Sequence, residues 1–72
     1  MKKKAELRTT THKLKEAQSA AEEYSKFTGF ARIFKNDCDR YIVEGNQRNP
    51  HYWEKLFAEY RDGRVFAQQP TN

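Results

Sequence analysis

The chain has 72 residues, a formal net charge of +4 and 36% hydrophobic residues, so it holds at most one small domain with a modest core. Its single cysteine excludes an internal disulfide, and no stretch is apolar and long enough for a membrane span or a secretory signal. We therefore expect an intracellular protein, cytoplasmic or, in a eukaryote, nuclear.

The positive charge is concentrated at the N-terminal end. Residues 1–15 hold six basic side chains and one acidic one, a net charge of +5, whereas residues 16–72 hold eight basic and nine acidic side chains, a net charge of −1. This division predicts a basic, partly mobile arm over residues 1–15, a compact domain over 16–67 and a disordered tail over 68–72.

The first predicted element is a long helix over residues 3–27, which contain no proline or glycine and are rich in good helix formers. Its apolar face is thin and follows a seven-residue spacing, with Leu7, Leu14, Ala17, Ala21 and Tyr24. The run Thr9–Thr10–Thr11 lowers helix propensity, so we expect the first dozen residues to fray. Thr28–Gly29 predicts the break after this helix.

Residues 30–44 have two interpretations. Apolar side chains recur with a helical period, which favours a second helix ending at Gly45–Asn46; they are Phe30, Ile33, Phe34, Cys38, Tyr41 and Ile42. The alternative is a β-hairpin with strands over 31–35 and 40–44 and a turn over 36–39, whose residues are poor helix formers. Neither strand alternates strictly between polar and apolar residues, so we favour the helix.

A third helix is predicted after Asn49 and Pro50, which suit the N-cap and the first helical position. Its apolar stripe consists of Tyr52, Trp53, Leu56, Phe57 and Tyr60, and Gly63 supplies the stop. This spacing predicts that Trp53 lies in the core, and the period of the preceding segment predicts that Cys38 is a buried, reduced packing residue.

The expected fold is an all-α bundle of three helices with a long, projecting, basic N-terminal helix. The alternative is an α+β fold with a β-hairpin at about residues 31–44. In so short a chain, the burial of apolar side chains does not balance the conformational entropy of ordering the backbone. A homodimer or a partner surface would supply further burial.

The sequence offers no set of catalytic or metal-binding residues. A structural zinc site needs four ligands in close pairs, and His12, Cys38 and His51 are widely spaced. Ser19 and Ser25 lie on a polar helix without a recognisable base. We therefore expect no metal, no cofactor and no enzymatic activity.

The basic arm is the main candidate for binding. Clustered lysines and arginines neutralise phosphates and release counterions, and the predicted nucleic-acid-binding residues are Lys2, Lys3, Lys4, Arg8, Lys13, Lys15 and Arg48. His51 and Tyr52 are predicted to form a secondary contact patch beside Arg48. A solubilising tail would have the same composition, and the arm lacks the apolar face of a membrane-surface helix.

The composition is typical of small phage-like regulators, and we expect a small non-catalytic regulatory or accessory protein. Its partner would be nucleic acid, a larger protein of the transcription or replication machinery, or both. The alternative is an adaptor or inhibitor that docks a helical face on a larger enzyme. A helix-turn-helix is disfavoured because Pro50–Trp53 would be a poor first turn for a recognition helix.

Overall fold

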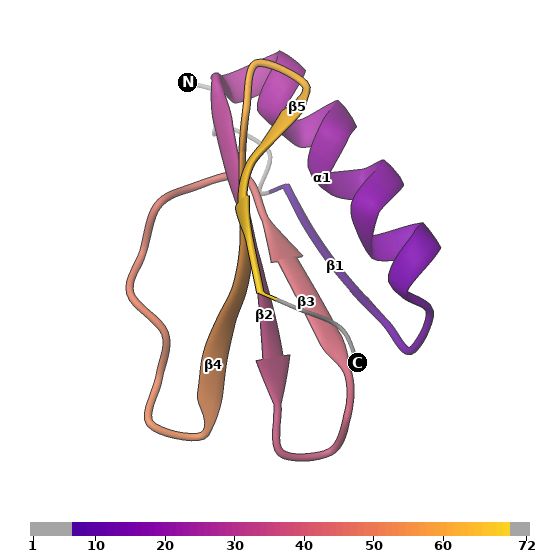
Figure 1. Ribbon diagram of the computed structural model, residues 1–72, viewed down its shortest axis with the longest axis vertical. Helices are drawn as coiled ribbons and strands as arrows, with labels where there is room; N and C mark the ends of the chain where they lie inside the picture. Colours follow the sequence, from indigo (N-terminus) through magenta and orange to yellow (C-terminus); the bar gives the residue numbers. More distant parts are fainter. Residues whose placement is uncertain (1–6, 70–72) are drawn as a thin grey trace, which may run out of the picture.

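The computed structural model describes residues 7–69, which form a five-stranded antiparallel sheet with one helix packed against it (Figure 1). The elements are β1 (Arg8–Thr11), α1 (Leu14–Thr28), β2 (Phe30–Asn36), β3 (Tyr41–Glu44), β4 (Glu54–Arg61) and β5 (Arg64–Gln68). The strands lie in the order β1-β3-β2-β4-β5, so β2 is central. The expected all-α bundle is therefore wrong, and the chain has the α+β fold of the alternative.

Within the predicted long helix, Arg8–Thr11 form a strand instead. Thr9, Thr10 and Thr11 belong to β1, where they pair with Val43, Ile42 and Tyr41 of β3. Threonine is β-branched and loses rotamer freedom in a helix, whereas a pleated strand accommodates it well. The helix begins only at Leu14, so the predicted projecting helix is wrong. Residues 1–6 of the predicted arm and 70–72 of the predicted tail lie outside the described residues.

The predicted break after the first helix is confirmed. Gly29 caps α1 in the left-handed conformation, with φ of 95°, and its N–H donates to the carbonyl oxygen of Ser25 at 2.8 Å. A residue without a Cβ atom adopts this conformation at little cost. The chain then reverses directly into β2.

The segment predicted as a second helix is the hairpin β2–β3, in which Arg32 pairs with Glu44 and Lys35 with Tyr41. The Asn36 side chain holds its turn, because its Oδ1 accepts from the backbone N–H groups of Cys38 at 2.9 Å and of Arg40 at 3.0 Å. Cys38 is exposed in this turn, so its predicted burial is wrong.

The predicted third helix is β4, and a β-bulge explains its helix-like pattern. Ala58 pairs with Ile33 of β2, but Leu56 pairs with Phe34, so Phe57 is an extra residue without a partner in the register. The bulge places Phe57 and Ala58 in the same core although they are adjacent in sequence. Apolar neighbours of this kind imitate the stripe of a helix.

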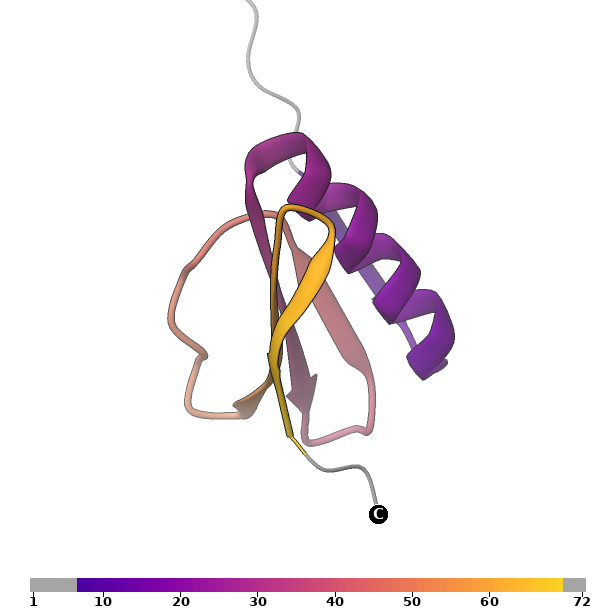
Figure 2. The same cartoon turned by 45° about the horizontal axis from the view of Figure 1, so that its top comes forward.

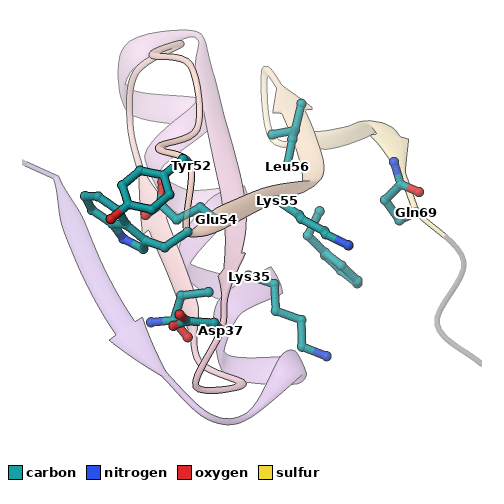
Figure 3. Close-up of a pocket in the computed structure, with 10 residues that line it drawn as sticks. Lys35, Asp37, Tyr52, Glu54, Lys55, Leu56 and Gln69 are labelled. Carbon is teal, nitrogen blue, oxygen red and sulfur yellow. The ribbon is translucent and has the colours of Figure 1, made fainter.

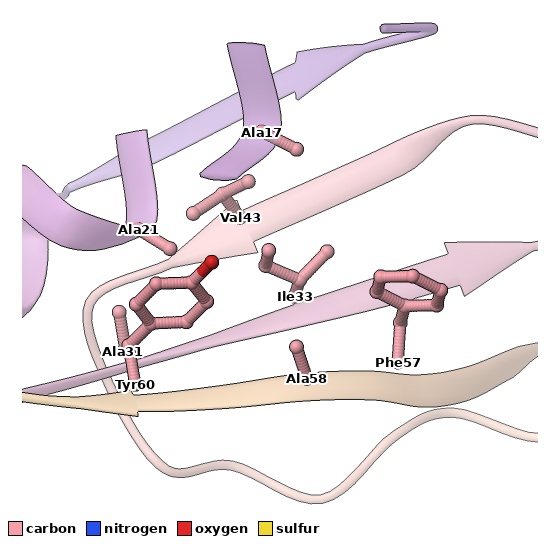
Figure 4. Close-up of a cluster of buried hydrophobic side chains, with 8 residues drawn as sticks. All are labelled: Ala17, Ala21, Ala31, Ile33, Val43, Phe57, Ala58 and Tyr60. Carbon is pink, nitrogen blue, oxygen red and sulfur yellow. The ribbon is translucent and has the colours of Figure 1, made fainter. Parts of the chain in front are cut away.

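The main core lies between α1 and one face of the sheet (Figure 4). Ala17 and Ala21 are fully buried on the helix, and Ile33 and Val43 are fully buried on the central strands. Small side chains on α1 let the helix approach the sheet closely, and the larger side chains of the sheet fill the space between them. Tyr60 and Phe57 of β4 complete this layer.

The opposite face of the sheet is crossed by the connection between β3 and β4, residues 45–53. Both strands are antiparallel to β2, so they run parallel to each other and the connection must travel the length of the sheet. Figure 2 shows α1 and this connection on opposite sides of the sheet. The sheet is consequently covered on both faces, by the helix on one and by the connection on the other.

The close contact between α1 and the sheet predicts that Ala21 tolerates no larger side chain. We expect Ala21→Leu to lower the free energy of unfolding by about 1–3 kcal/mol, because the added carbons must displace close-packed neighbours. Ser19→Leu adds the same side chain on the exposed side of the helix and should change stability by less than about 0.5 kcal/mol. Urea unfolding followed by circular dichroism measures both, and equal losses would contradict this packing.

Candidate nucleic-acid interface

Arg48 uses all five of its N–H donors, four to attach the β3–β4 connection to the sheet and one within the connection. Its Nη1 and Nη2 donate to Oε1 and Oε2 of Glu54 at 2.9 and 3.1 Å, a two-pronged contact. Nε and Nη2 also donate to Oε2 of Glu44 at 3.1 and 2.9 Å, and Nη1 to the carbonyl oxygen of Asn49 at 2.9 Å. Planar, charge-assisted pairs of this kind are among the strongest polar contacts in proteins. We call this group, Arg48 with Glu44 and Glu54, the arginine clamp.

The clamp also covers an apolar side chain of the central strand. The guanidinium carbon of Arg48 lies 4.1 Å from the centre of the Phe34 ring, which is fully buried on the face opposite α1. The face of an aromatic ring attracts a cation electrostatically, and the methylene groups of the arginine side chain add apolar contact. Phe34 is thus buried beneath the connection, outside the main core.

A second arginine fixes the same connection from the centre of the sheet. Arg32 of β2 donates from Nη1 to the carbonyl oxygens of Gln47 at 3.1 Å and Arg48 at 2.9 Å. Its Nη2 lies 3.6 Å from Oε1 of Glu59, and the other oxygen of this carboxylate, Oε2, accepts from Nε2 of Gln47 at 3.4 Å. These contacts give residues 45–53 a defined course although they contain no helix or strand.

The clamp keeps both of its carboxylates ionised. Hydrogen bonds from Arg48 lower the pKa of Glu54 despite its burial, and the backbone N–H of His51 lowers it further. Burial raises the pKa of Glu44, but hydrogen bonds from Arg48, Asn46 and Arg8 outweigh this effect and lower it overall. The two carboxylates in turn raise the pKa of Arg48. Their negative charge is therefore largely compensated within the clamp.

Three aromatic rings follow the clamp at the end of the connection. The imidazole of His51 stacks on the indole of Trp53 with ring centres 4.5 Å apart and an angle of 17° between the planes. Tyr52 meets the indole edge-on at 5.0 Å. Trp53 is 45% exposed and Tyr52 96% exposed, so the prediction that Trp53 lies in the core is wrong. We call these three residues the aromatic cluster.

On one side of Trp53 lies a hollow of about 600 Å³ on the sheet face opposite α1. Arg8 of β1 and Arg40 of the hairpin turn line it, together with Thr10, Ile42 and His51. Arg8 is half exposed and reaches Glu44 of the clamp at 3.3 Å, whereas Arg40 makes no ion pair within residues 7–69. We call this depression the arginine hollow.

On the other side of Trp53 lies a second hollow, of about 820 Å³ (Figure 3). Lys35 and Lys55 line it with Tyr52 and Leu56, and the two lysines are partners in the β2–β4 register. Lys35 lies 3.7 Å from the exposed carboxylate of Asp39, a surface pair of the weak kind. We call this depression the lysine hollow. It shares Asn36, Trp53 and Glu54 with the arginine hollow, so the two hollows meet at Trp53. Lys35 and Lys55 nevertheless project from the sheet face that carries α1, because Lys35 pairs with Tyr41, which packs against the main core.

The predicted arm residues divide into three groups. Lys2, Lys3 and Lys4 lie outside the described residues. Arg8 lines the arginine hollow, whereas Lys13 and Lys15 are exposed at the start of α1 and line neither hollow. The part of the arm that the structure describes therefore contributes one side chain to the candidate site.

The predicted secondary patch is partly rearranged. His51 and Tyr52 are exposed, and each lines one of the two hollows. Arg48 has no N–H donor left for a ligand, so we assign it to the framework of the site and not to phosphate contact.

Sequence reasoning missed the residues on which the site is centred. Trp53 was assigned to the core, and Arg40, Lys35 and Lys55 were not among the predicted binding residues. The useful signal was local: a single tryptophan follows His51 and Tyr52 directly after Asn49–Pro50, a pair typical of a loop. The two arginines and the two lysines come together only through the pairing of the strands.

The described residues hold no group of three His, Cys, Asp or Glu side chains placed to bind a metal ion. Within residues 7–69, α1 is too short and too polar to cross a membrane. No protein-family model matches the chain, and no curated protein and no solved structure is significantly similar to it.

The clamp predicts a large effect of removing Arg48. Arg48→Met should lower the free energy of unfolding by about 3 kcal/mol, because Glu54 would remain buried without a counter-charge and Glu44 would keep only the half-exposed Arg8. Arg61→Met is the matched control. Arg61 pairs with Glu59 at 3.1 Å but is half exposed, so its loss should cost less than about 1 kcal/mol.

The stability difference between the unmodified protein and Arg48→Met should depend on pH. The pKa values of Glu44 and Glu54 are lower in the folded protein than in the unfolded chain. Their contribution to the free energy of unfolding is therefore complete above the pKa of the unfolded chain, and it is lost as the pH falls through the pKa of the folded protein. The difference between the unmodified protein and Arg48→Met should therefore narrow below about pH 4.5, where the carboxylates become protonated. Denaturant unfolding across pH measures this, and a constant difference would show that Arg48 acts through packing alone.

Proposed function

We propose that the protein is a small non-catalytic accessory module that binds nucleic acid through the surface formed by the arginine hollow, the aromatic cluster and the lysine hollow. We call this surface the binding face. The observation that supports the proposal is the position of Trp53. It is exposed, it stacks on His51, and it lines two hollows, one with Arg8 and Arg40 on the sheet face opposite α1 and one with Lys35 and Lys55 on the other face.

The two kinds of side chain on this face match the two parts of a nucleotide. Aromatic rings stack on bases without sequence preference, and arginine or lysine neutralises phosphates. Of the acidic groups at the two hollows, the clamp compensates Glu44 and Glu54 internally, whereas the exposed Asp37 lines the lysine hollow without an ion-pair partner among the described residues and opposes a phosphate there. Asp39 is fully exposed and can release Lys35 at small cost.

The arm and the binding face make separable contributions in this proposal. Four basic side chains, Arg8, Arg40, Lys35 and Lys55, give a slope of log affinity against log salt of roughly −3, at about −0.7 for each phosphate contact on a single strand. Lys2, Lys3 and Lys4 would add up to about −2 more. Binding should consequently weaken steeply with salt.

We expect the double variant Arg8→Gln/Arg40→Gln to reduce the salt slope by about 1.4, because two phosphate contacts are lost. Lys13→Gln/Lys15→Gln removes the same charge from a site outside both hollows and should leave the slope nearly unchanged. Fluorescence anisotropy of a labelled oligonucleotide across a salt series measures both, and a triple Lys2, Lys3 and Lys4→Gln variant isolates the arm.

Equal losses of salt slope in the two double variants would show that only total charge matters and would contradict a localised binding face.

No binding at low salt would favour the alternative function, docking on a larger protein. The surface for that role would be the edge strand β5, where Val65 and Phe66 are 53% and 61% exposed. A helical face would be less suitable, since exposed carboxylates of Glu16, Glu22 and Glu23 lie along α1.

A further inference from the structure

We propose that the ligand of the binding face is a single strand, in which an unpaired base stacks on the His51–Trp53 pair and the flanking phosphates lie in the two hollows. This inference rests on the proposed function and specifies its substrate. It follows from the geometry of the aromatic cluster and from the absence of a duplex-reading element in residues 7–69.

The aromatic cluster can be reached only by an unpaired base. His51 and Trp53 form a near-parallel stack, and both residues are exposed, so a third planar ring can extend the stack. In a duplex each base is already covered by its neighbours on both faces. A base must leave that stack before an aromatic side chain can cover it, and this costs a few kcal/mol per step. In a single strand the cost is largely absent.

The positions of the charges define a path for the strand. Arg8 and Arg40 lie in the hollow on one side of Trp53, and Lys35 and Lys55 lie in the hollow on the other. A base on the indole therefore has Arg8 and Arg40 on the same face of the sheet for one phosphate, and a strand that passes around this end of the sheet brings a further phosphate to Lys35 and Lys55 on the other face. The volumes of about 600 and 820 Å³ are in the range of ligand pockets, so each hollow can also receive a base or sugar.

The described residues offer no comparable surface for a duplex. The only helix among them packs its small residues against the sheet and exposes Glu16, Glu22 and Glu23 together with Lys15 and Lys26, so it offers no basic face to the phosphates along a major groove. The edge strand β1 carries Arg8 as its only charged side chain. Four cationic side chains instead line the hollows beside the aromatic cluster, namely Arg8, Arg40, Lys35 and Lys55.

The test compares three labelled oligonucleotides of about twelve nucleotides, oligo(dT), oligo(rU) and an oligo(dT)·oligo(dA) duplex, on the full chain at low salt. We expect at least one single strand to bind about tenfold or more tightly than the duplex, and binding should quench the fluorescence of Trp53, the single tryptophan. The ratio of the oligo(dT) and oligo(rU) affinities then assigns the site to DNA, to RNA or to both.

Two variants separate stacking from charge. Trp53→Leu keeps apolar bulk but removes the ring, and it should weaken single-strand binding by about tenfold to a hundredfold without affecting the duplex. Trp53→Phe keeps a stacking ring and should retain most of the affinity. Melting followed by circular dichroism checks that both variants fold.

Equal or tighter binding of the duplex would overturn the single-strand inference while leaving the proposed function in place. Unchanged single-strand affinity in a folded Trp53→Leu variant would likewise overturn it. Failure of all three oligonucleotides to bind would instead remove the proposed function, and the inference with it.

Discussion

The arginine clamp determines how this small sheet can be covered on both faces. Residues 45–53 have no secondary structure, yet they must cross the central strand to join two parallel strands that are not neighbours. Arg48 makes this possible because one guanidinium satisfies Glu44, Glu54 and a backbone carbonyl while it covers Phe34. The same contacts hold His51 through Glu54, and so they set the position of the aromatic cluster.

Burial of both sheet faces also explains how far the sequence could predict the fold. The stop of the helix at Gly29 and the turn at Asn36–Asp39 were readable, since they depend on local backbone chemistry. The strands were harder to recognise, because Ile33 faces α1 while the adjacent Phe34 lies beneath Arg48, so the polar–apolar alternation of a half-exposed strand is lost. In β4 the bulge at Phe57 removed the alternation a second time.

The sequence predicted only those residues of the candidate site that local features mark. Arg8, His51 and Tyr52 were identified from charge and from their place near a loop, and each lines a hollow in the structure. Arg40 and Lys55 are distant in sequence from these residues and join them only through strand pairing. Arg48 could not be distinguished from a free surface cation until its two carboxylate partners were located. Long-range register, which local patterns do not encode, therefore created most of the site.

The central claim is that the clamp presents Trp53 and its neighbours as the surface that meets the ligand. Nuclear magnetic resonance of the ¹⁵N-labelled protein, titrated with a short unlabelled single strand, tests this directly. We expect the largest shifts at the indole N–H of Trp53, the amides of residues 51–55 and the Arg40 side chain, with α1 unaffected. Shifts confined to α1, to β5 or to residues 1–6 would contradict the claim.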